Sequence, residues 1–515
     1  MGPTLDEREE TGATPAGPWG VLVLMFASIL MGSTARGIAE WASPRLEAVL
    51  GMGEGQAASV ATAQILGFAL AAPLVGYLAD RSRRGRWLAV CMAILGLSTI
   101  GVGLAQSYFV LRLSRFGLGA GLGGFLVVAM TLMLDRVARG DRARMLACLA
   151  LAAALAPWLV GPITTTADRF IPWPLTCHAA GALVMLAALV FLAVPEPLRG
   201  ATEGVPANRL LAHEKAGAPQ EDYIDLMVNS SYTYAVLGMA FAAFAMVGLG
   251  HGLIPFLRVT RGIDVEGSRA MARLAANGGA ALGLILGGLF GDRLSKSRPG
   301  AMFEVAGLSM LGSLPMLALA IYARQPALAL GAFFAAQTLL MMHLGPCLAI
   351  IAGVTMPNMR GAAFGVAALG ASLIGGLWAP GMMGWVAGTF AQPDAMSTVF
   401  GRAFAALGAV PKAADARSFP ENQIAGLLVL IPAALFGGAF LLAGVRHLPR
   451  EMALMLAKLR AKPIVYRRKT APRPITRDRT QPVLLQGLTP DQSAATGGPP
   501  PVSPAEPGLQ GPAAG

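Results

Sequence analysis

Charged residues are scarce in this chain. Asp, Glu, Lys and Arg together make up 13% of its 515 residues, whereas a soluble domain carries roughly 25%. Hydrophobic residues make up 55%, and there are 64 glycines. A soluble multidomain protein is therefore nearly excluded, and the composition indicates a membrane protein.

Cysteines are also few, and they lie in apolar segments without paired or metal-like spacing. The four positions are Cys91, Cys148, Cys177 and Cys347. We interpret them as small buried residues, so neither a disulfide framework nor a metal site is expected.

Signatures of enzymes and of nucleotide-driven machines are missing too. The glycine-rich run Gly117–Gly124 lacks the terminal Lys-Ser/Thr of a phosphate-binding loop. We interpret this run as a small-residue face at which two helices approach each other. No nucleophile lies beside a base in a supporting context. We therefore expect no enzyme, no cofactor and no nucleotide-driven transport.

Long apolar runs fill most of the chain. Each is about 20 residues long, which is enough to cross a bilayer of about 30 Å, and alternating segments typical of a barrel are absent. The sequence predicts about twelve membrane helices, at 18–42, 56–79, 87–105, 109–134, 143–165, 174–194, 231–256, 267–290, 301–322, 327–354, 361–390 and 421–445.

One phrase occurs twice, each time where an apolar run gives way to a polar loop. The copies are Gly76-Tyr-Leu-Ala-Asp80-Arg81-Ser-Arg83-Arg84 and Gly288-Leu-Phe-Gly-Asp292-Arg293. Their aspartates lie 292 − 80 = 212 positions apart, close to half of the hydrophobic part of the chain. An arginine also follows the fourth span of each half, Arg142 and Arg360. Such repetition indicates two similar helix bundles in tandem.

The fold class predicted is therefore an all-α membrane protein with two pseudo-symmetric six-helix bundles. Five segments are expected: a cytoplasmic N-terminal segment 1–17, bundles 18–194 and 231–447, a cytoplasmic linker 195–230, and a basic, then Pro/Gly-rich disordered tail 448–515.

Cations concentrate on one side of the predicted spans. They are Arg81, Arg83, Arg84, Arg86, Arg136, Arg139, Arg142, Arg144, Arg293, Lys296 and Arg298. By the positive-inside rule, this side and both termini are cytoplasmic, in an inner or plasma membrane. Topology thus explains the net charge of +12 better than nucleic-acid binding does.

The basic tail from Lys458 to Arg479 is interpreted first as a solvated orientation signal. Alternatively, it binds anionic headgroups at about 1 kcal/mol per cation.

An aspartate at the end of a helix can pair with nearby cations or with the positive N-terminus of another helix in one conformational state. Alternatively, the motif only ends the helix and supplies positive charge that orients the span. Two copies at equivalent places favour a latch, meaning a contact that holds the cytoplasmic side closed in one state. The latch predicted comprises Gly76, Asp80, Arg81, Arg84, Gly288, Asp292, Arg293, Arg142 and Arg360.

At these motifs the chain resembles the major facilitator superfamily. Gly345-Pro346 followed by Met356-Pro-Asn-Met-Arg360-Gly361 is similar to the Spinster-like branch. The resemblance implies export of lysophospholipids or sphingoid lipids, with proton coupling in the better-known members.

Two carboxylates of that branch are missing here. Ala35 stands before Arg36 where the family has aspartate, and Leu122 follows Arg115 and its glycines where the family has glutamate. Proton coupling requires a titratable group that changes its exposure, so the coupling proton is uncertain.

Charges inside the spans are costly, by about 2.5–3.5 kcal/mol for a central Arg or Asp. We expect Arg36 and Arg115 to hold an anionic or zwitterionic headgroup, which a guanidinium binds in bidentate fashion. Snorkelling is the alternative for Arg115. Glu40 lies one turn after Arg36, pairs with it, and is the coupling candidate unless it is merely interfacial.

The second half supplies fewer polar candidates. His343 could bind substrate or titrate, although a lone histidine is more often a packing residue. Arg273 and Asn277 lie one turn apart and are expected to line the same cavity.

The sequence thus predicts a secondary transporter of a lipid-like or amphipathic organic substrate, working by alternating access. One alternative is an exporter of small hydrophobic drugs or metabolites. The other is a scaffold or sensor that no longer transports, for which the missing carboxylates argue.

Overall fold

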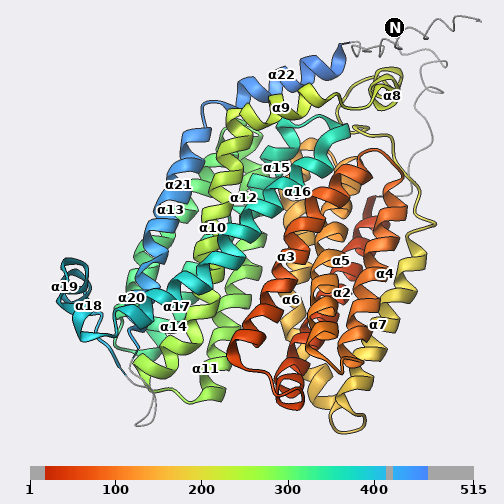
Figure 1. Ribbon diagram of the computed structural model, residues 1–515. Coiled ribbons are helices and arrows are strands. Elements are labelled where there is room, and N and C mark those ends of the chain that lie inside the picture. The colour runs from red at the N-terminus through yellow and green to blue at the C-terminus, as the bar shows by residue number, and fades with distance from the viewer. Residues whose placement is uncertain (1–17, 413–420, 462–515) are drawn as a thin grey trace, which may run out of the picture. The chain divides into compact units, whose positions relative to one another are not determined.

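The computed structural model describes residues 18–412 and 421–461 (Figure 1). The predicted segment 1–17 and the tail beyond residue 461 lie outside the described residues, so both interpretations of the basic tail stay predictions. Within the described part, the elements are helices, and only one isolated bridge, between Lys412 and Glu421, has β geometry.

The first group of spanning helices occupies the N-terminal part of the chain. It comprises α2 (Pro18–Val49), α3 (Glu54–Ala79), α4 (Arg84–Gly103), α5 (Tyr108–Leu134), α6 (Arg142–Ala167) and α7 (Trp173–Val190). Within it, α5 packs against α3 and α4, α7 packs against α4, and α2 packs against α6. Small residues such as Gly119, Gly121 and Gly123 let α5 approach its neighbours closely.

The second group contains the other six spans, and several of these are interrupted. Its elements are α10 (Ser230–Pro255) with a π-helical end at Phe256–Thr260, α11 (Val265–Ala272), η3 (Arg273–Gly278), α12 (Gly279–Ser295), α13 (Ala301–Tyr322), α14 (Pro326–Met341), α15 (Leu344–Val354), α16 (Arg360–Ala371), η5 (Ser372–Trp378), α17 (Ala379–Thr389), α20 (Gln423–Leu428) and α21 (Leu430–Gly444). Short helices α18 (Pro393–Ser397) and α19 (Val399–Ala406) connect α17 to α20.

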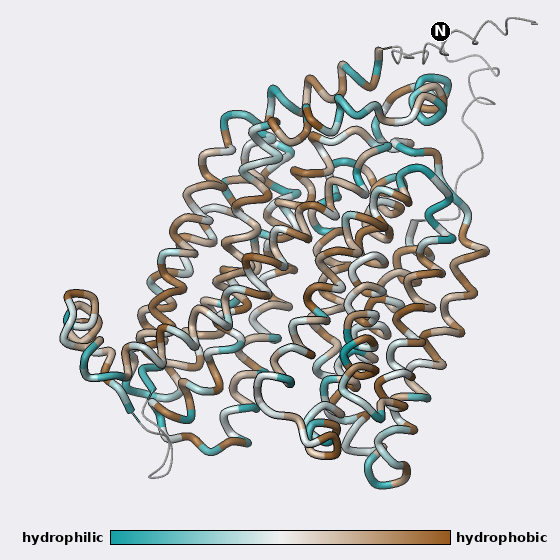
Figure 2. The backbone as a smooth tube through the Cα atoms, in the orientation of Figure 1, coloured by the Kyte–Doolittle hydropathy of each residue, from teal (hydrophilic) through white to brown (hydrophobic). Residues whose placement is uncertain are grey.

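Twelve helices of the described chain are long and apolar enough to cross a membrane, which confirms the predicted number. In Figure 2 their tubes are mostly brown, whereas the connections carry more teal. Large apolar side chains such as Leu97, Leu186 and Leu308 point outwards and are about 60% exposed (62%, 64% and 60%). Lipid rather than water covers such surfaces, so the chain is an integral, multi-pass membrane protein.

The ends of some predicted spans are wrong. The first was expected to stop at residue 42, but α2 continues through Pro44 to Val49. Arg45 is accommodated there because its guanidinium lies 4.1 Å from the centre of the Trp41 ring and pairs with Asp168 at 2.7 Å.

The tenth span contains a break that was not predicted. Its first part, α14, ends at Met341, and its second part, α15, begins at Leu344.

The two groups meet along two pairs of helices. In the first pair α3 packs against α16, and in the second α6 packs against α12. Figure 1 shows α3, coloured orange-red, beside α16 at the end that also carries α8 (Ala207–Ala216), α9 (Gln220–Val228) and α22 (Leu448–Arg460). We call this end, which contains Asp80 and Asp292, the Asp-Arg face. Helix α22 is fixed there because Glu451 accepts hydrogen bonds from the N–H groups of Ser230 (3.1 Å) and Ser231 (2.8 Å).

Candidate functional site

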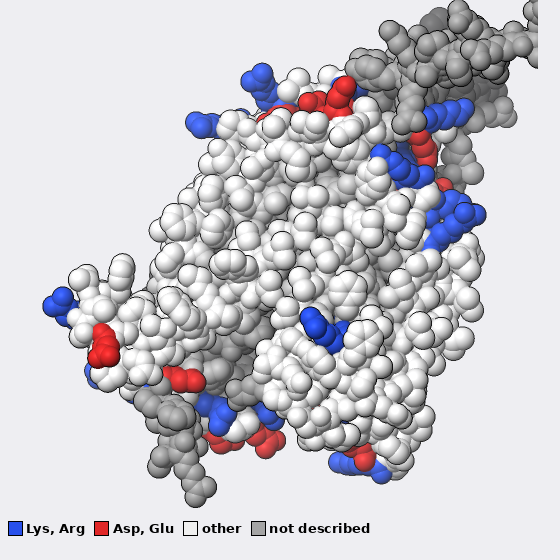
Figure 3. All heavy atoms as spheres, in the orientation of Figure 1, with Lys and Arg blue, Asp and Glu red and all other residues white. Residues whose placement is uncertain are grey.

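A cavity of about 360 Å³ lies between the two groups of helices. One wall comes from α2, α3, α5 and α6, and the other comes from α10, α14, α15, α16 and η5. Nearly all of its lining is apolar; the polar members are Arg36, Gln64, His343 and Ser372. Figure 3 shows most charged side chains at the ends of the spans and a surface hollowed between the two groups, away from the Asp-Arg face.

Arg36 is the cation of the cavity wall. Its Nη1 lies 3.3 Å from Oε1 of Glu40, and the Arg36 side chain is 38% exposed, so the predicted ion pair is present. Within the described part of the chain, the buried Nε of Arg36 has no hydrogen-bond partner. The pair therefore leaves Arg36 with unused donor capacity next to the cavity.

Arg115 lies one layer behind the wall and is only 4% exposed. It donates from Nη1 to Oε1 of Gln64 (2.9 Å) and from Nη2 to the carbonyl of Ala39 (2.8 Å). Gln64 in turn donates to Glu40 (3.1 Å). Gln64 thus joins both arginines and the glutamate into one network that carries a net charge of +1, and it is the member of this network that reaches the cavity alongside Arg36.

His343 also lines the cavity, from the break between α14 and α15, and is 3% exposed. Its Nδ1 lies 2.5 Å from the carbonyl of Leu340. Because a carbonyl only accepts hydrogen bonds, Nδ1 carries the proton in the neutral ring, which leaves Nε2 as an acceptor.

The remaining predicted site residues lie elsewhere. Arg273 is exposed and Asn277 is half-buried in the π-helical segment η3, and neither is among the residues that line the cavity. Glu40 is 47% exposed and reaches the cavity only through its partners. Of the two positions without the family carboxylates, Leu122 lines the cavity, whereas Ala35 is buried and does not.

At the Asp-Arg face, Asp80 bridges the two groups of helices. Its carboxylate accepts hydrogen bonds from the N–H groups of Gly361 (3.0 Å) and Ala362 (2.8 Å), in the first turn of α16. Among the described residues, the guanidinium that comes nearest is that of Arg199, at 3.9 Å. The partner of Asp80 is therefore the positive end of a helix from the other group, rather than one of the arginines that follow it.

Asp292 makes the same contact in the opposite direction. It accepts from the N–H groups of Ala143 and Arg144, both at 2.9 Å, in the first turn of α6. Each repeated aspartate thus accepts hydrogen bonds from a helix of the other group. The helix bonded by Asp80 begins at Arg360, and the helix bonded by Asp292 begins at Arg142. The two contacts are related by the same pseudo-symmetry as the sequence repeat.

Glycine is required where these helices cross. A Cβ placed on Gly76 would lie 2.1 Å from the carbonyl oxygen of Gly361. A Cβ on Gly288 would lie 2.7 Å from the Cα of Arg144. Only a residue without a side chain lets the backbones come this close.

The arginines Arg142 and Arg360 converge on Glu203, a residue of the segment between α7 and α8. Arg142 donates to its carboxylate at 2.6 Å, and Arg360 and Arg139 also pair with it. Glu203 is 3% exposed, and the turn that carries it is bounded by Gly200 and Gly204, with φ of 78° and 63°. These left-handed backbone positions favour glycine.

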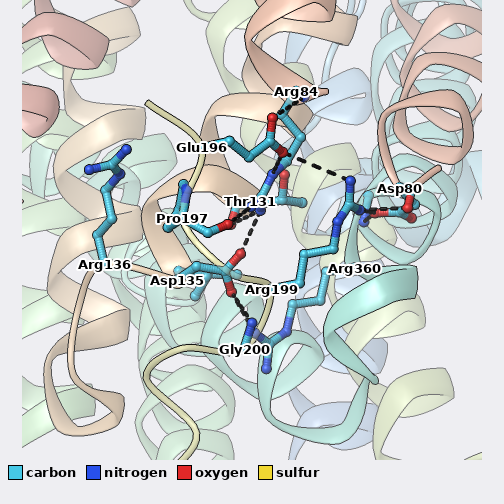
Figure 4. Close-up of polar contacts among 12 residues, drawn as sticks. Asp80, Arg84, Thr131, Asp135, Arg136, Glu196, Pro197, Arg199, Gly200 and Arg360 are labelled. Atoms are coloured by element: carbon cyan, nitrogen blue, oxygen red, sulfur yellow. Dashed lines mark hydrogen bonds and ion pairs between the residues drawn. The ribbon is translucent and has the colours of Figure 1, made fainter. Parts of the chain in front are cut away.

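Asp135 joins this group to Arg84. Arg84 pairs with Asp135 at 2.6 Å and with Glu196 at 2.9 Å, while Arg360 lies 3.6 Å from the other oxygen of Asp135. Figure 4 shows Arg84, Asp135 and Glu196 together, with Arg360 beside them. A single buried ionic network therefore connects both groups with the segment between them.

The other two arginines of the predicted latch lie outside this network. Arg81 stacks on Tyr77, with its guanidinium 3.7 Å from the ring centre, and donates to the hydroxyl of Tyr223 (3.2 Å). Arg293 is exposed and has no ion pair among the described residues.

Burial and charge shift the pKa values of carboxyl groups at this face, including those of Asp80 and Glu203. Burial raises the pKa of Asp80 to about 7, against the lowering effect of the Ala362 and Gly361 N–H groups. Burial also raises the pKa of Glu203, but Arg360, Arg142 and Arg139 outweigh it and lower that pKa to about 2. Glu203 is therefore ionised at all physiological pH values, whereas Asp80 changes protonation near neutrality.

Several important residues were missed by the sequence analysis, chiefly Gln64, Asp135, Glu196, Arg199 and Glu203. Gln64 had a signal, because a lone amide inside an apolar span requires a partner. Of the two glutamates in the segment between the groups, Glu203 had a weaker signal, because it lies between Gly200 and Gly204. Neither signal identifies the partner.

The chain matches a family model, and it is similar to several known transporters. The model of the Major Facilitator Superfamily matches residues 21–380. Protein spinster homolog 1 of Bos taurus is 27% identical over 367 residues, which cover 66% of this chain and 67% of the relative. An MFS-type efflux pump of Mycolicibacterium smegmatis is 27% identical over 293 residues, 56% of this chain and 66% of the relative. A crystal structure of a bacterial homolog to the human lysosomal transporter Spinster, inward-facing and unoccupied, has a TM-score of 0.52 at 21% identity and covers 86% of this chain and 97% of that one.

Proposed function

The chain belongs to the major facilitator superfamily, and we propose that this transporter moves a lipid-like, amphipathic organic substrate across the membrane by alternating access. The family assignment and the resemblance to the Spinster-like branch agree with the sequence prediction. The relatives are named as transporters, not as enzymes. The substrate class is argued from the cavity.

The main support is one cation in an apolar cavity. Arg36 reaches the cavity with an Nε that is unpaired among the described residues, and the network of Arg36, Glu40 and Arg115 keeps a net charge of +1. A phosphate or carboxylate headgroup would bind Arg36 in bidentate fashion. The apolar remainder of the wall suits an acyl chain, and its methionines, Met130, Met239, Met246 and Met341, adapt to irregular shapes.

His343 and Gln64 complete the polar part of this binding site. The acceptor Nε2 of His343 suits a substrate hydroxyl, which a glycerol or sphingoid backbone carries beside its headgroup. Arg115 acts through Gln64, because it holds the amide whose side chain lines the cavity. Arg273 and Asn277 do not contact the substrate in this proposed arrangement, because neither lines the cavity.

The conformation supports movement between two states. The aspartate contacts and the Glu203 network hold the Asp-Arg face closed, while the surface is hollowed on the other side (Figure 3). We take the Asp-Arg face and both termini as cytoplasmic, following the positive-inside rule. The cavity is then open to the outside here, and rupture of both contacts would open it to the cytoplasm.

Proton coupling is assigned to Glu40 because Ala35 and Leu122 replace the two carboxylates of the family. It is the carboxylate of the cavity network, and its protonation would release Arg36 to the substrate. The alternative substrate class, small hydrophobic drugs or metabolites, is favoured by the apolar wall and by similarity to the efflux pump. Such a substrate would not need Arg36.

Reconstitution separates the two classes. Proteoliposomes would be tested with lysophospholipids, a sphingoid base and apolar drugs, with and without a pH gradient. Arg36→Gln should abolish most lysophospholipid transport, whereas Arg112→Gln, which alters an exposed arginine of α5 outside the cavity, should not. Drug transport that survives Arg36→Gln, together with no lysolipid transport by the unaltered chain, would overturn the lipid assignment.

A further inference from the structure

A second cavity, of about 480 Å³, lies at the Asp-Arg end of α2 and α6. We propose that it binds an anionic phospholipid of the adjoining leaflet, with the headgroup phosphate at Arg136 and Arg144. Its wall is formed by Trp19 and Leu22 of α2, Arg136, Val137 and Ala138 of the loop after α5, and Asp141, Arg144, Met145 and Cys148 around the start of α6.

Arg136 is the strongest indication of a ligand. The residue is 8% exposed, and its Nη2 donates to the carbonyl of Pro195. Its Nε and Nη1 are buried and have no hydrogen-bond partner among the residues that the structure describes. Although Asp135 is its neighbour in sequence, Figure 4 shows the Arg136 guanidinium turned away from the network of Asp135 and Arg84. No carboxylate of residues 18–412 or 421–461 pairs with Arg136. Buried cations without such a partner are rare, and an anionic oxygen in the cavity would supply one.

Arg144 provides the second cation, at the rim. Its side chain is 51% exposed; it pairs with Asp141 at 2.5 Å and lies 3.9 Å from Asp292. Asp141 itself lines the cavity and reduces its positive charge, so the two arginines and this aspartate leave a net charge of +1. One phosphodiester carries one negative charge and matches it.

The apolar part of the wall favours a lipid over a soluble anion. Leu22, Met145 and Cys148 continue the cavity along the spans, where an acyl chain would lie. Trp19, 75% exposed at the first turn of α2, has the position that tryptophan prefers at membrane interfaces. The cavity therefore has cations at its membrane-interface end and an apolar wall along the spans. A phospholipid of that leaflet has the same order of polar headgroup and apolar chains.

Another occupant is available within the chain. The acidic run Asp6-Glu-Arg-Glu-Glu10 precedes α2 and would match the charge of the arginines. It carries no apolar side chain that could occupy the wall of Leu22, Met145 and Cys148, so the lipid fits the whole cavity better. The test must nevertheless separate the two.

Lipid binding at this cavity would be linked to the state of the transporter. The backbone N–H of Arg144 bonds Asp292 across the two groups, and its side chain lies in the cavity. A lipid that orders the start of α6 would therefore stabilise the Asp292 contact. Closure of the Asp-Arg face would then depend on the anionic lipid content of the membrane.

The experiment uses the purified full chain in nanodiscs of phosphatidylcholine with increasing phosphatidylglycerol. Bound phosphatidylglycerol is counted by native mass spectrometry, and thermal unfolding is followed in parallel. Arg136→Gln should weaken phosphatidylglycerol retention by about tenfold or more, whereas Arg86→Gln, which removes an exposed arginine of the same face outside the cavity, should leave it within twofold. Equal losses in both variants, or no loss in Arg136→Gln, would overturn the proposal.

Two further variants keep the test decisive. Cys148→Phe fills the apolar part without changing the charge and should also reduce retention, which covers the case in which Arg136→Gln does not fold. Glu7→Gln, Glu9→Gln and Glu10→Gln together test the internal occupant. If phosphatidylglycerol binds to this triple variant in an Arg136-dependent manner but not to the unaltered chain, the acidic segment fills the cavity and the proposal fails.

Discussion

The carboxylate of Asp80 bonds the backbone N–H of Gly361 at 3.0 Å, across 281 positions of the chain. Asp292 repeats this relationship with Ala143 at 2.9 Å, in the reverse direction between the two groups. Each contact places a carboxylate at the positive end of a helix. The two halves are thus held together at the Asp-Arg face by two equivalent contacts, and both must break for that face to open.

The first prediction concerns the glycine beside this contact. Gly76→Ala places a Cβ 2.1 Å from the Gly361 carbonyl, so α3 and α16 must separate. We expect a shift towards the conformation open at the Asp-Arg face and a loss of at least about tenfold in transport. Labelling of single cysteines at that face measures the shift. Gly55→Ala, in the same helix with nothing within 4 Å of its Cβ, is the control and should behave as the unaltered chain.

The second prediction is a pH dependence set by Asp80. Its pKa is about 7 in the closed state, and hydration after opening would return it towards the ordinary value of 3.8. The state with the higher pKa binds the proton more tightly. Acidification from about pH 8 to about pH 5 should therefore increase the ratio of closed to open molecules, by up to about tenfold per pH unit.

Spin labels at the exposed residues Arg86 and Arg446, one in each group, would report closure by their distance. Asp80→Asn should reduce the slope of this pH dependence. Asp394→Asn alters an exposed aspartate at the other end of the spans and should leave it intact. A slope in Asp80→Asn as steep as in the unaltered chain would contradict the prediction.

The third prediction concerns Glu203. Its replacement by glutamine leaves Arg142 and Arg360 buried with one fewer carboxylate, a change that costs about 3–5 kcal/mol in other buried ion pairs. We expect a large drop in the melting temperature of the closed form and more access to the cavity from the Asp-Arg face. Glu221→Gln, at an exposed position of α9, should change neither quantity.

The fourth prediction tests the role of Gln64. Gln64→Leu removes a partner of both Glu40 and Arg115, and hydrogen bonds to charged groups contribute about 1.5–3 kcal/mol. Affinity for an anionic lysolipid should fall roughly 10- to 100-fold in equilibrium binding. Gln337→Leu replaces a buried amide of α14 that lies outside the cavity, and binding should be retained.

The fifth prediction addresses coupling. If Glu40 is the titrating group, Glu40→Gln should make transport insensitive to a pH gradient while binding continues, because Arg36 remains in the wall. Transport rates in proteoliposomes with imposed gradients provide the measurement. An unchanged pH dependence in Glu40→Gln would refute this role.

Much of the fold was predictable because each span carries its own signal. An apolar run of about 20 residues forms a membrane helix whatever surrounds it, so all twelve helices were identified. Interruptions of the helices were not predicted: η3 begins at Arg273 and η5 contains Gly375 and Gly376. Such local geometry depends on the packing of neighbouring helices, which composition does not record.

The candidate site was less predictable. Arg36 and His343, identified as rare polar residues inside spans, do line one cavity, whereas Arg273 and Asn277, identified by the same criterion, do not. Rarity indicates that a polar side chain has a purpose. It does not indicate which neighbours that side chain meets.

The sequence by itself determined the membrane class, the number of spans and the existence of two repeated halves, since these follow from hydropathy and from the Asp80 and Asp292 motifs. Tertiary structure decided the partners: Asp80 bonds the first turn of α16, Arg142 and Arg360 meet at Glu203, and Gln64 joins Arg36 to Arg115 through Glu40. The physical reason is that hydropathy is a property of each segment. A hydrogen bond or ion pair requires two groups within about 3 Å, and only the packing of helices distant in sequence brings them there.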